Sequence, residues 1–111
     1  MPEAASGNQK LDRMMEQIPA GQLRVTLHAH KEMLEEDFSM DDVCDGILSG
    51  QLLEDYPAHK RGPCCLVAGR TRSERAIHTV CTTAQPVLII ITVYEPKPPK
   101  WPTPTQRRIT G

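Results

Sequence analysis

The spacing of apolar residues predicts helices in the first half of this chain and strands in the second. Apolar side chains in 10–18 recur every three or four positions, which predicts a short amphipathic helix. Pro19 and Gly21 are expected to end it. Residues 22–27 alternate between apolar and polar side chains, which predicts a short strand. The chain is therefore expected to begin with a helix and a strand.

Two further helices are predicted to follow in tandem. The first begins at His28 and consists of good helix formers. Ser39 opens the second, because its hydroxyl can accept a hydrogen bond from a free N–H group of the first turn. Asp41 and Asp42 suit the positive end of the helix dipole, and Gly50 is expected to stop the helix in the left-handed conformation.

From Gln51 onward the period of the pattern changes to two, which is typical of strands. Four strand segments are predicted, at 51–56, 64–70, 75–83 and 86–94. The connections between them are short enough to join neighbouring antiparallel strands. The predicted fold class is therefore α+β, with two helices packed on one face of a four-stranded antiparallel meander and a short N-terminal strand.

The 111 residues leave room for one domain with a thin core. Neither end is expected to pack, because the start is small and polar and the end is rich in proline. We predict a flexible or helical N-terminal extension over 1–20, a single α+β domain over 21–96 and a proline-rich tail over 97–111. No stretch approaches the roughly 20 apolar residues of a membrane-spanning helix, and the start lacks a signal-peptide pattern. A cytoplasmic protein without a membrane partner is expected.

Charge is divided unevenly along the chain. Residues 1–55 hold twelve acidic and four basic side chains, and 56–111 hold two acidic and nine basic ones, so the halves carry formal charges of −8 and +7. If the halves form one body, one side is acidic and the other basic. A basic surface attracts phosphate groups by counterion release. The sequence therefore points to an anionic partner.

The register of the last three strands decides which side chains share a face. Two-residue turns are predicted between them, at 73–74 and 84–85. Arg75 would then lie opposite Arg72 and Tyr94, with Arg70 in the next row of the same face. His78 would lie on the other, apolar face, unless a bulge exchanges the two. The cationic end of the first face, beside the Tyr94 phenol, is the predicted site.

Several short motifs carry a resemblance to a known family: HAHKEM (28–33), FSMDDV (38–43), YP (56–57), RGP (61–63), LVAGR (66–70), IH (77–78) and ITVYEP (91–96). Together they resemble an uncharacterised bacterial family labelled as a domain of unknown function. That family is similar to the RelE-type toxins and to the barnase, EndoU and colicin nuclease group, whose fold is two helices on a four-stranded antiparallel sheet. The likeness covers about residues 22–96. Many relatives have arginine where this chain has Glu32 and Glu36.

The resemblance and the basic segment together favour a small RNA-binding domain, with metal-independent endoribonuclease activity left open. Cleavage needs a base for the 2′-hydroxyl, an acid for the leaving 5′-oxygen and cations at the phosphate. His78, Tyr94 and His28 are the candidate catalytic residues, because imidazole titrates near neutrality and a phenol can donate a hydrogen bond. The candidate ligand-binding residues are guanidinium groups, which suit phosphate geometry: Arg70, Arg72, Arg75 and Arg61.

Other interpretations stay open. The arginines could form a solvated hairpin end, and His78 could be a satisfied core histidine. The acidic helices and the proline-rich arm could instead make a non-enzymatic protein-interaction module, for example with a basic antitoxin-like partner. The tail alone could lie across an edge of the sheet and protect it.

Neither a metal nor another cofactor is expected. His28 and His30 could chelate a metal only if they shared a face, and no carboxylate or thiol stands at a fixed spacing from them. A helix cap at His28 and an exposed His30 explain the pair equally well. The four cysteines also lack the spacing of a zinc finger, so free and mostly buried thiols are expected.

Overall fold

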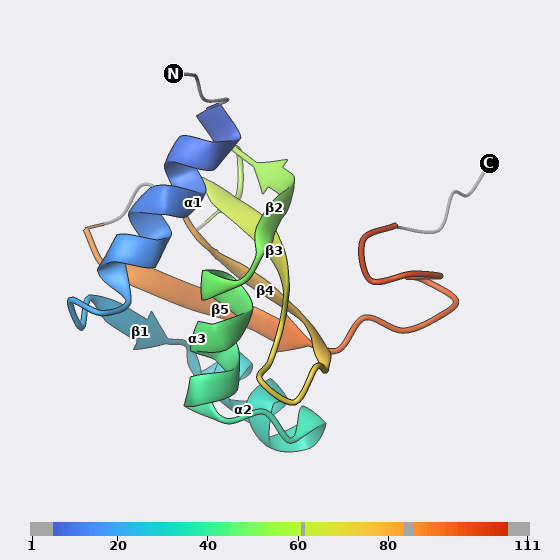
Figure 1. Cartoon of the computed structure of the whole chain (residues 1–111). Coiled ribbons are helices and arrows are strands. Elements are labelled where there is room, and N and C mark those ends of the chain that lie inside the picture. The colour runs from blue at the N-terminus through green and yellow to red at the C-terminus, as the bar shows by residue number, and fades with distance from the viewer. Residues whose placement is uncertain (1–5, 61, 84–85, 107–111) are drawn as a thin grey trace.

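The computed structural model describes residues 6–60, 62–83 and 86–106, with side chains from residue 11 onward (Figure 1). Within these ranges the chain forms three helices and five strands. In order, they are α1 (Ser6–Gln17), β1 (Leu23–Val25), α2 (Leu27–Glu36), α3 (Met40–Leu48), β2 (Gln51–Tyr56), β3 (Cys64–Arg70), β4 (Ala76–Thr82) and β5 (Leu88–Tyr94). No helix in the described ranges is both long enough and apolar enough to cross a membrane.

The five strands form one mixed sheet in the order β1-β5-β4-β3-β2. Strands β2 to β5 make the predicted antiparallel meander. Strand β1 adds a parallel edge, with Leu23 opposite Leu88 and Val25 opposite Ile90. The backbone of Gln22 and Thr26 extends this pairing at both ends. The α+β class is therefore confirmed, and the short N-terminal strand belongs to the main sheet.

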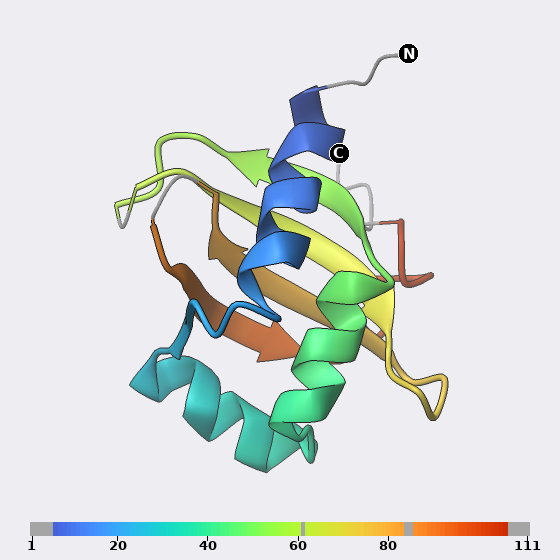
Figure 2. The ribbon, with the colours of Figure 1, turned by 60° about the vertical axis from the view of Figure 1, so that its left-hand side comes forward.

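All three helices cover the same face of the sheet (Figure 2). Helix α1 is part of this layer, since Leu11 and Met14 are buried in the core. The Met14 sulfur lies 3.5 Å from the thiol of Cys81 and 3.8 Å from that of Cys65. The amphipathic helix predicted over 10–18 is therefore part of α1, and this layer has three helices where two were predicted.

The starts of α2 and α3 follow from local capping. Thr26 rather than His28 caps α2, because its hydroxyl accepts a hydrogen bond from the Ala29 N–H group. At α3 the predicted cap is confirmed: Ser39 and Asp42 each accept a hydrogen bond from the other's backbone N–H group.

The glycines around α3 serve close packing. Ser49 ends α3 in the right-handed conformation, so the predicted left-handed stop at Gly50 is wrong. A Cβ atom at Gly50 would stand 2.5 Å from the Val67 side chain. A Cβ atom at Gly69 would overlap the carbonyl group of Gly46. Helix α3 therefore lies directly on the backbone of β3. Neither Gly50 nor Gly69 has room for a side chain.

The register of the hairpins differs from the prediction. Ala68 pairs with His78, because the β3–β4 turn has three residues, 72–74, with the Thr71 N–H group donating to the Arg75 carbonyl. In the next pair of strands, His78 lies opposite Tyr94, and the other predicted turn, 84–85, lies outside the described residues. A shift of one residue exchanges the faces of a strand. His78 therefore lies on the face away from the helices, together with Tyr94.

Candidate functional site

His78 is the centre of a polar cluster on the sheet face opposite the helices. His78 lies on β4, the central strand of the sheet. It is 0% exposed, even though no helix covers this face of the sheet. The Nδ1 atom lies 3.1 Å from the Tyr94 hydroxyl, and the Nε2 atom lies 2.5 Å from the Pro104 carbonyl oxygen. The imidazole ring also meets the edge or face of two aromatic rings, 4.4 Å from Trp101 and 5.2 Å from Tyr94 between centroids.

The partners of His78 define its hydrogen-bonding roles. A carbonyl oxygen only accepts, so the Nε2 atom must carry a hydrogen and donate it to Pro104. In the neutral ring, Nδ1 is then an acceptor, and the Tyr94 hydroxyl donates to it. This arrangement fixes the orientation of the imidazole and directs Nε2–H toward the Pro104 side of the cluster.

Residues 97–106, which we call the tail, cover this cluster. Trp101 is 2% exposed and packs against His78 at nearly a right angle. Its backbone N–H group donates to the Lys97 carbonyl, which turns the chain back over the sheet. The tail thus covers the middle of the sheet face, where β4 runs, and not an edge. The sequence left two alternatives open, an extended arm for a partner or a segment that lies across an edge of the sheet; a single large apolar ring among prolines was the available sign that the tail docks.

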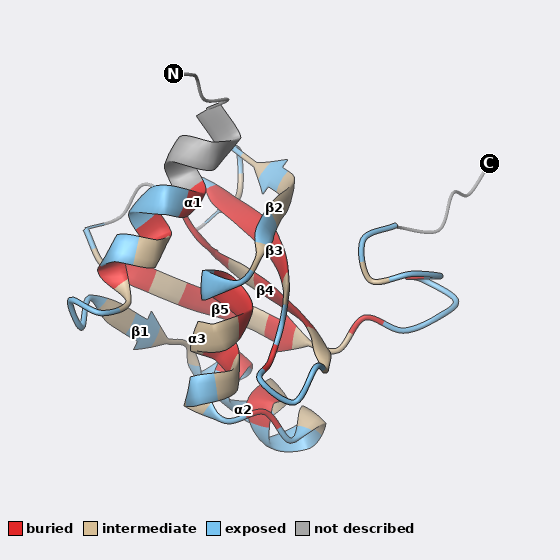
Figure 3. Ribbon diagram, in the orientation of Figure 1, coloured by how far each residue is buried: buried red, intermediate tan, exposed pale blue. Residues whose placement is uncertain are grey.

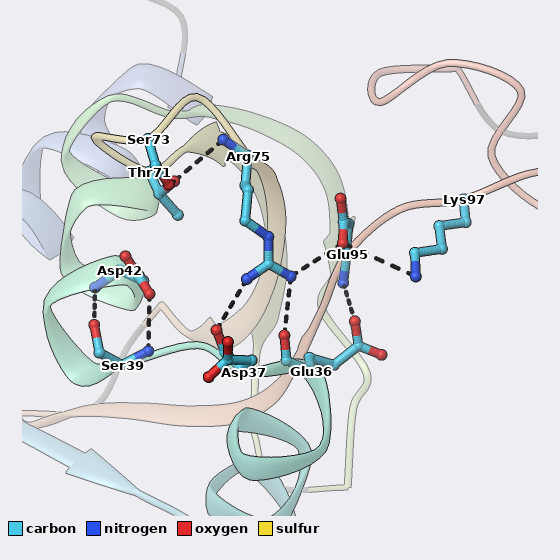
Figure 4. Close-up of polar contacts among 9 residues, drawn as sticks. All are labelled: Glu36, Asp37, Ser39, Asp42, Thr71, Ser73, Arg75, Glu95 and Lys97. Atoms are coloured by element: carbon cyan, nitrogen blue, oxygen red, sulfur yellow. Dashed lines mark hydrogen bonds and ion pairs between the residues drawn. The ribbon is translucent and has the colours of Figure 1, made fainter.

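Arg75 makes its hydrogen bonds to groups of the protein itself (Figure 4). Its guanidinium group donates to the carbonyl oxygens of Glu36 and Asp37, both at 2.9 Å, and to the Glu95 carboxylate at 3.0 Å. It also lies 4.0 Å above the centre of the Phe38 ring. These contacts neutralise the negative end of α2 and join that helix to the hairpin and to β5. A ligand role for Arg75 stays a prediction without support from this geometry.

Of the other predicted arginines, Arg70 follows Ala68 on the face of the sheet that His78 and Tyr94 share, whereas Arg72 lies in the turn after β3. Arg72 is 88% exposed and pairs with Asp45 of α3 at 3.2 Å. Arg70 is exposed at the end of β3, where its guanidinium donates to the Glu74 carbonyl. Arg61 lies outside the described residues. The expected open cluster of cations is not formed, because Arg72 pairs with Asp45, Arg75 pairs with Glu95 and the tail covers His78.

A shallow groove of about 730 Å³ lies where α3, the β3–β4 hairpin and the tail meet. Arg70 and Arg72 line it together with Asp45, so its walls carry both signs of charge. Pro104, whose carbonyl accepts from His78, forms part of the rim. The groove therefore opens beside the His78 cluster, and Arg70 is the candidate cation between them.

Two acidic side chains of α2 accept hydrogen bonds from the backbone of the sheet. Glu32 accepts a hydrogen bond from the Val93 N–H group and Glu36 accepts one from Glu95, both on the edge of β5 that β1 leaves uncovered. Arginine has no acceptor and could not make these bonds. His28 pairs with Glu32 at 3.3 Å and is 67% exposed. Since α2 lies on the helix-covered face, the structure does not bring His28 to His78.

The cysteines and histidines give no metal site in the part of the chain that the structure describes, where no three potential ligands cluster. All four cysteines are free, and three of them are buried. The neighbouring Cys65 thiol and burial raise the pKa of Cys81 well above its ordinary value. At Cys44, burial and then the charges of Asp41 and Asp45 raise the pKa.

Fold and site together define a small α+β domain with a layer of helices on one face of a mixed sheet and a buried histidine–tyrosine pair under a tail on the other. Residues 25–95 match the family described as Domain of unknown function (DUF4258). The match spans more than half of the chain, so the chain belongs to this family. Comparison with curated proteins gives no match. Comparison with solved structures gives none either.

Proposed function

We propose that this domain binds RNA at the His78–Tyr94 cluster and acts there as a RelE-like, metal-independent endoribonuclease. The observation that carries the proposal is the direct contact between these two side chains, which come from neighbouring strands and share one face. An imidazole held by a phenol is suited to move a proton at a phosphodiester. The helices on one face of an antiparallel meander agree with the fold expected from the resemblance to RelE-type toxins.

Each side chain has a defined role in this proposal. From the imidazolium form, His78 Nε2 gives its proton to the leaving 5′-oxygen, because Nδ1 is occupied by the Tyr94 hydroxyl. Tyr94 keeps the ring in one orientation and stabilises the imidazolium form if its hydroxyl turns to accept. Arg70, exposed at the end of β3, supplies the cation for the phosphate, since its guanidinium can make two parallel hydrogen bonds to it.

Binding is tested with the full chain and a fluorescein-labelled uridine oligonucleotide, followed by fluorescence polarisation at two salt concentrations. Arg70→Ala is expected to weaken binding about tenfold and to reduce the salt dependence. Arg24→Ala is the matched control, because it removes the same charge from an exposed residue on β1, two strands away from β4. Equal losses in the two variants would mean that the attraction is non-specific, and no binding at low salt would reject the proposal.

Cleavage is tested on the same oligonucleotide by gel analysis of the products. Tyr94→Phe keeps the ring and removes the hydroxyl that holds His78. Loss of an oriented proton-transfer group is expected to slow cleavage by about 100-fold or more, with binding changed by no more than about twofold. Products that appear at the same rate in Tyr94→Phe would remove the catalytic part of the proposal and leave RNA binding alone.

A further inference from the structure

We propose that the tail is a reversible cover that competes with RNA for the His78–Tyr94 cluster. This inference rests on the function proposed above and adds its regulation. In the structure the tail already fills the positions that a bound nucleotide would need. RNA and the tail therefore cannot occupy the His78–Tyr94 cluster at the same time.

The groups that the tail presents correspond to those of a nucleotide. The Trp101 ring meets the imidazole of His78 at nearly a right angle, with 4.4 Å between centroids, and so occupies the space beside His78 that a base would need. The Pro104 carbonyl oxygen accepts the hydrogen of Nε2, as an oxygen of the phosphodiester would. One aromatic ring and one acceptor oxygen thus occupy the two sides of His78 at once.

The attachment of the tail is slight compared with that of the helices. Eight of its ten residues are exposed, and Trp101 is the one that is buried. At its start, Lys97 pairs with Glu95 at a distance of 3.9 Å, and the lysine is exposed. Contacts between exposed charges are weak and are screened by salt. The tail can therefore leave the sheet without opening the core on the other side.

The chemistry under the tail also differs from that of a surface covered for stability alone. His78 offers an N–H donor and Tyr94 a hydroxyl, both polar groups that water or a ligand could satisfy equally well. A cover that served only to hide apolar surface would not need a carbonyl placed on the imidazole. A buried N–H donor without an acceptor is costly. The Pro104 carbonyl therefore gives the His78 Nε2–H group an acceptor while no ligand is bound.

The single tryptophan of the chain reports the state of the cover directly. In the full-length wild type, an unlabelled uridine oligonucleotide is expected to increase acrylamide quenching of Trp101 several-fold and to shift its emission to longer wavelength. Trp101→Ala is expected to bind the labelled oligonucleotide about tenfold more tightly, because the competitor has lost its anchor. Pro102→Ala, an exposed neighbour in the tail, is the matched control and is expected to bind like the wild type.

The outcomes separate this inference from the proposed function. Oligonucleotide that binds the wild type with no change in Trp101 quenching, and binds Trp101→Ala with the same affinity, overturns the cover and leaves RNA binding intact. Absence of binding to both proteins overturns both. Should Trp101→Ala fail to fold, as judged by circular dichroism, the quenching experiment on the wild type decides by itself.

Discussion

The two faces of the sheet are closed in different ways (Figure 3). On one face, three helices bury an apolar core that includes side chains from every layer, among them Met14, Met33, Ile47, Val67 and Ile77. On the other face, the tail packs one buried tryptophan against His78, which in turn contacts Tyr94. The first closure removes a large apolar area from water and is needed for folding. The second rests on one tryptophan and two polar side chains, so we expect it to contribute less to stability than the first.

Arg75 shows why the helix-covered face holds charges as well as apolar groups. Its guanidinium group donates to two free carbonyl groups at the end of α2, where the helix has no further N–H groups to offer. The guanidinium group also lies 4.0 Å from the centre of the Phe38 ring, which adds a cation–π contact. Arg75 was predicted to bind a ligand. In the structure it connects the end of α2 to the β3–β4 hairpin.

The largest expected effect tests the closure by the helices. Met14→Ala removes a fully buried side chain between α1 and the sheet and is expected to lower the free energy of unfolding by about 3 kcal/mol. Glu16→Ala, an exposed residue of the same helix, is the control. Urea unfolding followed by circular dichroism measures both. A loss below about 1 kcal/mol for Met14→Ala would mean that α1 is not part of the core.

The next effect concerns the joint at the end of α2. Arg75→Ala removes three charge-assisted hydrogen bonds from a half-buried site and is expected to cost about 2 kcal/mol of unfolding free energy. Arg72→Ala removes an equal charge from an exposed ion pair with Asp45 and is expected to change stability little. The same urea titration compares them. Equal losses of unfolding free energy in the two variants would show that Arg75 contributes only through its charge and not through its bonds to the end of α2.

The tail-covered face should be much less sensitive to the loss of its anchor. Trp101→Ala removes a larger side chain than Met14→Ala, but it is expected to cost only about 1 kcal/mol. The reason is that the tail can leave as a unit, which limits the loss to the free energy of its docking. A loss as large as that of Met14→Ala, measured in the same titration, would make the two faces equivalent and weaken the case for a cover.

The smallest expected effect is a difference in labelling rate between Cys44 and the three buried thiols. Cys44 is expected to react first with iodoacetamide in the native protein, because the thiols of Cys64, Cys65 and Cys81 are buried. Its raised pKa lowers the thiolate fraction at neutral pH, so the rate should be slow there and rise as the pH approaches that pKa. Mass spectrometry of the labelled protein follows each site. Early labelling of Cys65 or Cys81 would mean that the helix layer opens readily.

Local patterns predicted the elements well. The change in period at Gln51 marks the change from helices to strands, and the Ser39 cap lies where the sequence predicted it. Both depend on interactions within a few residues, which a sequence displays directly. The catalytic candidates His78 and Tyr94 were also named from residue chemistry, although on opposite faces.

What the sequence by itself determined is the α+β class, the order of the elements and the kinds of side chain available for chemistry, because these follow from local periodicity and composition. The tertiary structure alone decided that His78 meets Tyr94, that Arg75 joins α2 to the hairpin, and that Trp101 packs against His78. The physical reason is that one additional residue in the turn at 72–74 exchanges every side chain of β4 between the faces. Docking of the tail likewise depends on a surface assembled from strands distant in sequence, which no local pattern encodes.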